Sequence, residues 1–301
     1  MFTDLSAFPL TPLHDDEVDE VAYAGLIERL ASAGVDSITA LGSTGAYPYL
    51  TADERRRLAR IAIRHAGDIP VIVGVGALRT SQVIEFARDA ADAGAAGLLL
   101  APLTYQPLTD DDVFGLYEQV TTAVPLPVIV YDNPGTTHFR FSDSLYARIT
   151  ELSTVASIKI PGVPAGPDAA RARVGQIRSH IPERVSIGIS GDASAARGLN
   201  AGCDAWYSAI GGTIPEPALA ICRSARSGDA AAASAESDRL QPLWDLFAEH
   251  GGSFRVIAAI AELAGLVKPN SIPLPLRGLD EPARDRVARV VRELDLIPSA
   301  S

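Results

Sequence analysis

Short apolar segments recur along most of this chain at the spacing of a repeated strand-and-helix unit. Most of them end at Gly, Pro or a small polar residue. They recur at intervals of roughly 20 to 34 residues, the length of one β-strand plus a crossover helix. The segments with this pattern are residues 6–10, 37–41, 71–75, 97–101, 128–131, 155–160, 185–189 and 205–210. Few folds accommodate eight such units in one chain.

The stretches between these segments have the spacing of amphipathic helices. The repeating apolar positions include Leu26, Ile27, Leu30 and Ala31, then Leu58, Ile61, Ala62 and His65, then Val83, Phe86, Ala87 and Ala90. Two of these helices are expected to end at Gly34 and Gly94, since glycine readily adopts the left-handed terminal conformation. Continuous apolar strands indicate a parallel sheet covered by helices. The sequence therefore predicts an α/β fold, a (β/α)₈ TIM barrel, with a doubly wound sheet as the alternative.

The strand pattern ends after about residue 215, and the rest of the chain has a helical pattern. Helices are expected around 229–250, 253–264 and 281–294, separated by Gly251–Gly252 and by a Pro-rich stretch. We therefore expect a barrel over residues 1–226 and a C-terminal helical appendage over residues 227–301. The last four residues are expected to form a frayed tail.

Composition excludes several classes of function. The net charge of −11 and the pI near 4.9 argue against a nucleic-acid surface. The densest basic group, Arg55–Arg57, follows two acids early in a helical segment and is interpreted as a solvated helix face. Two cysteines are too few for a disulfide framework or a zinc site. The chain contains neither an apolar run that could span a membrane nor a signal-peptide pattern, so a cytoplasmic protein is expected.

Lys159 is unusual because this chain otherwise uses arginine for positive charge. Only two of the 26 basic residues are lysines, and Lys159 stands near the end of the apolar segment 155–160. An amine can lose its proton and form an imine with a ketone, whereas a guanidinium stays protonated. The other lysine, Lys268, lies beyond the barrel in a segment with no evident polar partner.

Polar residues gather where the predicted strands end, which is where a barrel places its chemistry. They occupy residues 42–45, 102–107, 131–137, 159 and 190–192. Tyr131 and Lys159 are one β/α unit apart and should project from adjacent strands. The small residues of 42–45 offer free backbone N–H groups to a carboxylate. Taken singly, Tyr131 also fits a strand-end aromatic anchored by its hydroxyl, and Asp192 fits a helix N-cap.

The order Gly-Ser-Thr-Gly, Tyr-x-x-Pro, an apolar strand with Lys, and Ser-Gly-Asp resembles the dihydrodipicolinate synthase and N-acetylneuraminate lyase family over nearly the whole chain. The resemblance implies a class I aldolase or related lyase, built as a (β/α)₈ barrel with a C-terminal helical region and assembled as a homotetramer or homodimer. By this resemblance, the site residues are the Schiff-base lysine Lys159, the proton-relay Tyr131, the carboxylate-binding pair Ser43 and Thr44, and the pocket-lining Gly191 and Tyr207.

The chain departs from that family where the second substrate binds. The arginine that receives the carboxylate of the aldehyde in dihydrodipicolinate-forming members is Thr136 here, and Arg140 is the nearest candidate to replace it. The tyrosine that such members offer to a neighbouring subunit aligns with Thr104, with Tyr105 beside it. The resemblance thus implies that the imine chemistry is kept and that the contacts to the second substrate are changed.

A neutral Lys159 would attack the ketone of pyruvate or another 2-oxo acid, and the iminium would allow a C–C bond to form or break. Lowering the lysine pKa from 10.4 to about 7–8 requires destabilising the charged form by roughly 3–4 kcal/mol. Ala156, Ile158 and Ile160 are expected to supply this desolvation, with no adjacent acid to oppose it. The second substrate is an aldehyde or a sugar acid, and no cofactor is needed.

Three alternatives remain open at the level of sequence. Instead of a Schiff-base aldolase with a changed second substrate, the chain could be a true 4-hydroxy-tetrahydrodipicolinate synthase, a metal-dependent aldolase, or a barrel that binds a 2-oxo acid without catalysis. The five histidines show no metal-ligand spacing, and only His138 lies near the proposed site. Retention of Lys159 together with Tyr131 argues against the non-catalytic alternative.

Overall fold

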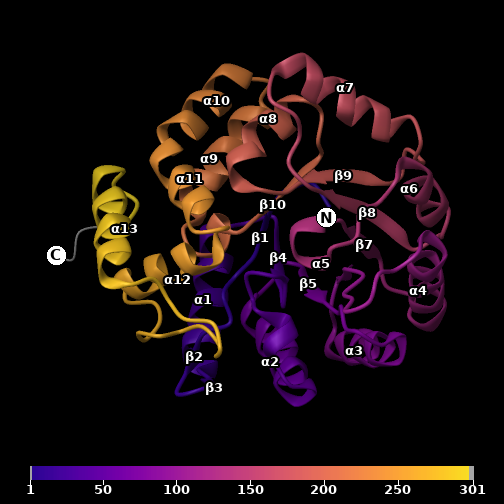
Figure 1. Ribbon diagram of the computed structural model, residues 1–301, viewed down its shortest axis with the longest axis horizontal. Helices are drawn as coiled ribbons and strands as arrows, with labels where there is room; N and C mark the ends of the chain where they lie inside the picture. The colour runs from indigo at the N-terminus through magenta and orange to yellow at the C-terminus, as the bar shows by residue number, and fades with distance from the viewer. Residues whose placement is uncertain (1, 298–301) are drawn as a thin grey trace.

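The computed structural model of the protein describes residues 2–297, and within them eight parallel strands close into a barrel surrounded by helices (Figure 1). The barrel strands follow one another in chain order, and β1 closes the ring between β10 and β4. Their bounds are β1 Asp4–Ala7, β4 Ser37–Ala40, β5 Val71–Gly74, β6 Gly97–Leu100, β7 Val128–Tyr131, β8 Val155–Ile160, β9 Ser186–Ile189 and β10 Ala205–Ser208. The TIM-barrel prediction is confirmed, and the doubly wound alternative is wrong.

Helices cross from most strands to the next. They are α1 Glu20–Ala33, α2 Ala52–His65, α3 Thr80–Ala93, α4 Asp110–Ala123, α5 Pro134–Thr137, α6 Asp143–Thr150, α7 Pro167–Arg178, α8 Ala195–Asn200 and α9 Pro215–Arg226. Helices α1 and α3 end at Gly34 and Gly94, both with left-handed backbone angles, as predicted. Short 3-10 turns, η1 Tyr47–Tyr49, η2 Asp192–Ser194 and η3 Ile210–Gly212, follow three of the strands.

Buried apolar side chains form two separate clusters, because successive residues of a strand point to opposite faces. One cluster fills the barrel interior and includes Ile72, Leu99 and Ile129. The other lies between the strands and the helices and includes their neighbours Val73 and Leu98. The strands are therefore continuously apolar in sequence, although alternate residues pack into the barrel interior and into the outer cluster beneath the helices. This alternation decides which side chains can reach the interior of the barrel.

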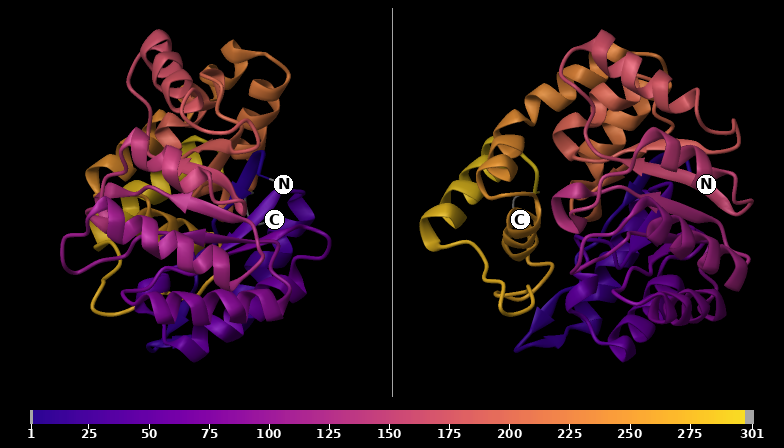
Figure 2. Two further views of the ribbon diagram at one scale, coloured as in Figure 1. Left: turned by 90° about the vertical axis from the view of Figure 1, so that its right-hand side faces the viewer. Right: turned by 45° about the vertical axis from the view of Figure 1, so that its right-hand side comes forward.

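The C-terminal helices are α10 Ala230–Arg239, α11 Gln241–Glu249, α12 Phe254–Leu263 and α13 Glu281–Glu293. They lie on one side of the barrel, with α13 at the outer edge (Figures 1 and 2). Helix α10 packs on α8 and α9, and α11 contacts η2 beside the end of β9. The appendage thus borders the barrel mouth. The boundary between residues 226 and 227 remains a prediction.

The boundaries of several elements differ from the prediction. The helix expected over 229–250 is two helices that meet at Leu240, because Pro242 is tolerated only in the first turn of a helix. The first strand lies earlier than the predicted 6–10, and a short hairpin of β2 Leu13–His14 and β3 Glu17–Val18 follows it. The expected frayed tail at 298–301 lies outside the described residues. No helix in the described part of the chain is long and apolar enough to cross a membrane.

Candidate active site

Lys159 lies on β8 beside the last residue of β7, inside the barrel. The register pairs it directly with Tyr131 across the two parallel strands, as the sequence predicted. Residues paired across neighbouring strands point to the same face of the sheet, so Lys159 and Tyr131 both point into the barrel. Lys159 is only 5% exposed, so its amine is removed from solvent. The charge state of a buried amine depends on the groups that surround it.

Three aromatic rings surround the amine of Lys159. The Nζ atom lies 4.4 Å from the centroid of Tyr131, 5.1 Å from that of Phe8 and 5.8 Å from that of Tyr207. Burial among them lowers the pKa of Lys159 to about 7. At neutral pH a large fraction of the amine is therefore uncharged and nucleophilic.

The source of this desolvation differs from the one expected. Ile158 and Ile160 belong to the outer core between strands and helices, on the opposite face of β8 from Lys159. The rings of Phe8, Tyr131 and Tyr207 replace them. The expectation that no acid opposes the shift is also wrong, because Asp192 and Asp132 both act to raise the pKa of Lys159. Burial outweighs these two carboxylates.

The hydroxyl of Tyr131 connects β7 to the loop that follows β4. It lies 3.0 Å from Oγ of Ser43, and Nδ2 of Asn133 donates to it at 2.8 Å. A phenol that accepts from Asn133 retains its own proton to donate to Ser43. Burial raises the pKa of Tyr131, and these two hydrogen bonds lower it in part. Neighbouring Thr44 is buried in the same loop.

Asp192 lies just after β9 and connects it to β10 and to the turn that follows β10. Its carboxylate accepts hydrogen bonds from Nε1 of Trp206 at 3.1 Å, Oγ of Ser208 at 3.2 Å, and the backbone N–H groups of Ala209 at 3.2 Å and Ile210 at 2.8 Å. The N-cap interpretation is therefore wrong, since these donors come from β10 and the turn after it. Gly191, the predicted pocket-lining residue, precedes η2 with a positive φ of 81°.

Tyr207 forms the floor beneath the amine. Its hydroxyl lies 2.7 Å from Oγ of Ser157, which in turn donates to the carbonyl of Ser186 at 3.3 Å. The phenol therefore donates downward, away from Lys159, and presents only its ring to the amine. A Cβ at Gly188 would lie 2.1 Å from this ring, so the glycine makes the room that the tyrosine fills. Burial raises the pKa of Tyr207 well above its usual range.

The other predicted site residues lie in the loops around the mouth. Thr136 is exposed on α5, with its hydroxyl 3.4 Å from the carbonyl of Asn133. Thr104 donates its hydroxyl to the carbonyl of Gln106, and Tyr105 beside it is 88% exposed. Arg140 is exposed, although its charge acts on Asp132. The structure thus brings Lys159, Tyr131 and Tyr207 together, whereas the hydrogen bonds of Thr104 and Thr136 stay within their own segments.

Comparisons of the sequence and the structure with known proteins identify the family of this chain. The sequence matches the Dihydrodipicolinate synthetase family over residues 1–294. The chain belongs to this family. A 4-hydroxy-tetrahydrodipicolinate synthase of Phenylobacterium zucineum is 30% identical over 299 residues, 99% of each chain. A solved dihydrodipicolinate synthase from Agrobacterium tumefaciens superposes with a TM-score of 0.93 at 40% identity, covering 97% of this chain and 98% of the other.

A second solved structure is the prophage protein YagE from E. coli K12, a member of the dihydrodipicolinic acid synthase family in complex with pyruvate. It superposes with a TM-score of 0.88 at 26% identity, covering 98% of this chain and 99% of the other. As a member of this family the protein is a lyase, of the class I aldolase type. Its residues 2–297 contain no group of three or more His, Cys, Asp or Glu side chains arranged to hold a metal ion.

The sequence did not predict several residues and contacts of this site. Phe8 lies just beyond β1, in an apolar segment that shows no sign of which face each residue takes. Asn133 follows Tyr131 by two residues, a spacing that could have indicated a shared face at the strand end. Asp192 was in the recognised Ser-Gly-Asp motif, but its donors on β10 and in the turn after it lie 14 to 18 positions away. Contacts between distant strands required the three-dimensional fold.

Replacing the buried lysine is expected to stabilise the fold. At pH 7, Lys159→Met should raise the free energy of unfolding by roughly 4 kcal/mol, because unfolding restores a pKa near 10.5 to an amine held near 7. Between pH 7 and 10 the unfolded chain binds a proton that the folded protein does not, so wild-type stability rises with pH. The advantage of the variant should therefore shrink by roughly 2–3 kcal/mol at pH 9.5, measured by urea denaturation.

Lys268→Met is the matched control for this measurement. The sequence suggested no polar partner for Lys268, but its Nζ lies 3.1 Å from Oδ2 of Asp19, and the lysine end of this pair is exposed to solvent. Exposed pairs contribute about 0–1 kcal/mol, so this variant should be neutral or slightly less stable at both pH values. A Lys159→Met variant that is less stable than wild type at pH 7 would show that the amine is not held neutral by burial.

Proposed function

We propose that this lyase forms a Schiff base between Lys159 and the ketone of pyruvate or another 2-oxo acid, and then makes or breaks a C–C bond or dehydrates a sugar acid. The single observation that carries the proposal is the amine enclosed by three aromatic rings with a pKa near 7. The nitrogen lone pair adds to the ketone carbon, and loss of water gives an iminium. The iminium accepts the electron pair of the C–H or C–C bond that breaks at the neighbouring carbon and so becomes an enamine, and the reverse steps form the bond.

In this proposal Tyr131 moves the protons of imine formation. Its hydroxyl belongs to a chain with Ser43 and Asn133, and its ring lies against the Lys159 amine. A phenol held in this way can protonate the departing hydroxide of the carbinolamine and recover the proton during hydrolysis. Ser43 and Thr44, in the loop after β4, would hold the carboxylate of the 2-oxo acid, with Gly191 and Tyr207 lining the pocket. The solved relative YagE, described with bound pyruvate, supports a 2-oxo acid as the first substrate.

A binding barrel without catalysis is the weaker alternative. A lysine buried among three rings reduces the stability of the fold, whereas a methionine would fill the same space at no such cost. Binding of a keto acid requires donors to its carboxylate, and it does not require an amine with a lowered pKa. The cytoplasmic location expected from the sequence is part of the same proposal.

Borohydride reduction tests the imine directly. With pyruvate or a longer 2-oxo acid, reduction should leave a covalent mass increase on Lys159, located by peptide mapping. Lys268 is the internal control and should stay unmodified, because its amine lies outside the barrel and is ion-paired with Asp19. Tyr131→Phe keeps the ring and should slow adduct formation by about 10²–10⁴. An adduct on Lys268, or none with any 2-oxo acid tested, would eliminate the imine mechanism.

We further propose that the aldehyde of the named relatives is a poor second substrate here. Receiving its carboxylate takes a cation, and a charge-assisted contact contributes about 1.5–3 kcal/mol. Thr136 offers one neutral hydroxyl, already 3.4 Å from the carbonyl of Asn133. True synthase activity would need Arg140, which is exposed, to turn into the mouth.

A coupled assay with pyruvate and aspartate semialdehyde should accordingly give a kcat/KM below about 10⁴ M⁻¹s⁻¹, beside higher values with sugar acids or hydroxy-oxo acids. Thr136→Arg should raise the semialdehyde value at least tenfold, since about 1.4 kcal/mol corresponds to one decade. A wild-type value at or above about 10⁴ M⁻¹s⁻¹ would instead identify the protein as a true synthase.

We propose a homotetramer or homodimer in which the mouth faces a second copy. Loops after three successive strands, β4, β5 and β6, each expose a large apolar side chain: Tyr49 is 49% exposed, Leu78 62% and Tyr105 88%. Neighbouring strands place these loops along one edge of the mouth, which favours a protein partner there. Tyr105→Ser should weaken this assembly in sedimentation velocity, and a wild-type monomer at micromolar concentration would contradict it. One solved relative, 25% identical, is described as a monomeric dihydrodipicolinate synthase variant.

A further inference from the structure

Arg55 differs from the two arginines that follow it. All three were interpreted as a solvated face, and Arg56 and Arg57 do pair with acids near the surface. Arg55 instead is only 5% exposed, so the interpretation is wrong for this residue. Burial lowers its pKa to about 10, only the phenol of Tyr47 acts against that shift, and no carboxylate among the described residues pairs with the guanidinium. A buried cation without an anion is costly and calls for a specific role.

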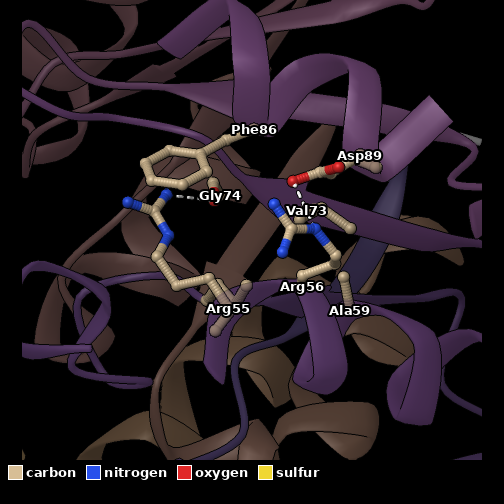
Figure 3. Close-up of a pocket in the computed structure, with 9 residues that line it drawn as sticks. Arg55, Arg56, Ala59, Val73, Gly74, Phe86 and Asp89 are labelled. Carbon is tan, nitrogen blue, oxygen red and sulfur yellow. Dashed lines mark hydrogen bonds and ion pairs between the residues drawn. The ribbon is translucent and has the colours of Figure 1, made fainter. Parts of the chain in front are cut away.

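The guanidinium of Arg55 holds the end of β5. Nη2 donates to the carbonyl of Gly74 at 2.9 Å, and Nη1 donates to the carbonyl of Gly76 at 3.0 Å. The ring of Phe86 stacks on it at 3.8 Å, and that of Tyr47 lies at 5.3 Å. Figure 3 shows Arg55 beneath Phe86 with its bond to Gly74, while Arg56 turns to Asp89. One planar fork thus fixes two carbonyls that a single ammonium group could not span equally well.

The cavity beside Arg55 has no room for a ligand. Its volume is about 10 Å³, at the lower limit for a single water molecule. The cavity therefore cannot hold an anion that would pair with Arg55. Its partners are the two carbonyls and the two rings, and its role must be sought in what these groups support.

The strand end held by Arg55 packs directly against the loop that carries Ser43 and Thr44. A Cβ on Gly74 would lie 1.9 Å from the carbonyl oxygen of Leu41, where this loop begins. A Cβ on Gly76 would lie 3.1 Å from the hydroxyl of Tyr47, just after the loop. Leu41 itself has a positive φ of 57°, a conformation that a branched residue keeps only when its surroundings impose it. Both ends of the loop therefore rest on the strand end that Arg55 fixes.

This loop in turn reaches the reaction centre. Oγ of Ser43 lies 3.0 Å from the hydroxyl of Tyr131, whose ring covers the Lys159 amine. A shift of the loop by less than an ångström would move the carboxylate-binding hydroxyls relative to the amine. Such a shift would weaken binding of the carboxylate, because its hydrogen-bond donors would no longer be in position.

We propose that Arg55 is a positioning residue, which bridges the carbonyls of Gly74 and Gly76 and thereby holds Ser43 and Thr44 in place for the carboxylate of the 2-oxo acid. It does not touch the substrate, and it acts through the β5 end and the loop. This inference rests on the proposed function, because it needs Ser43 and Thr44 to bind that carboxylate.

The test compares Arg55→Lys with the matched control Arg56→Lys, one residue along the same helix and on its ion-paired face. Pyruvate concentration is varied in borohydride trapping, which gives a half-saturating concentration and a rate at saturation. Arg55→Lys keeps the charge and loses the fork, so half-saturation should rise about tenfold, while the saturating rate stays within about threefold of wild type. Arg56→Lys should leave both values unchanged. Wild-type half-saturation in folded Arg55→Lys would overturn the proposal.

Two further variants separate positioning from general damage. Phe86→Leu removes the stacked ring without touching either carbonyl bond, and it should raise half-saturation about twofold to fivefold; it carries the test if Arg55→Lys fails to fold, and an unchanged value would then overturn the proposal. In a double-mutant cycle, Arg55→Lys and Ser43→Ala should be non-additive, because both act on one contact. Additive effects would refute action through the loop. A wild-type protein that traps no 2-oxo acid would instead refute the proposed function.

Discussion

The burial of one amine among aromatic rings is the constraint on which the rest of this molecule depends. A lysine with its ordinary pKa would be protonated inside the barrel, and only the removal of water makes it a nucleophile near pH 7. The barrel provides that environment because its interior cluster includes Phe8, Tyr131 and Tyr207 at the level of Lys159. Asp132 and Asp192 partly oppose the shift and keep the pKa from falling further. The reactivity of the amine is thus a balance between rings and carboxylates.

The fold could be predicted from the sequence because each repeat carries its own local signal. The apolar segments, the helical spacing between them and the terminal glycines at 34 and 94 all agree, and local agreement of this kind favours one topology. The errors fall where a local rule is broken. Pro242 interrupts an otherwise helical pattern at Leu240, and the hairpin of β2 and β3 consists of two residues per strand, too short for a periodic signal.

The site could be predicted only as far as strand order determines neighbours. Tyr131 and Lys159 are partners because parallel strands one unit apart lie side by side, and that much follows from their positions in the chain. The choice of Phe8 and Tyr207 as the desolvating rings depends on which face each strand residue takes after the barrel closes. The three arginines at 55–57 make the same point, since about 100° of helical rotation per residue separates a buried fork from two surface ion pairs. Identical side chains in succession carry no local sign of that difference.

Strand residues and loop residues therefore have separate consequences for function. Lys159, Tyr131 and Tyr207 are held by strand register and by the hydrogen bonds of the two tyrosines, all of which the fold itself imposes. Thr104, Tyr105 and Thr136 lie in loops at the rim and are partly or fully exposed. Substitutions there cost the fold little, because they disturb neither of the two cores. Identity near 30% to a named synthase shows the family of this chain, and the second substrate belongs to the proposal. In the proposed reaction the second substrate would meet the rim, where Thr136 offers a neutral hydroxyl and no charge.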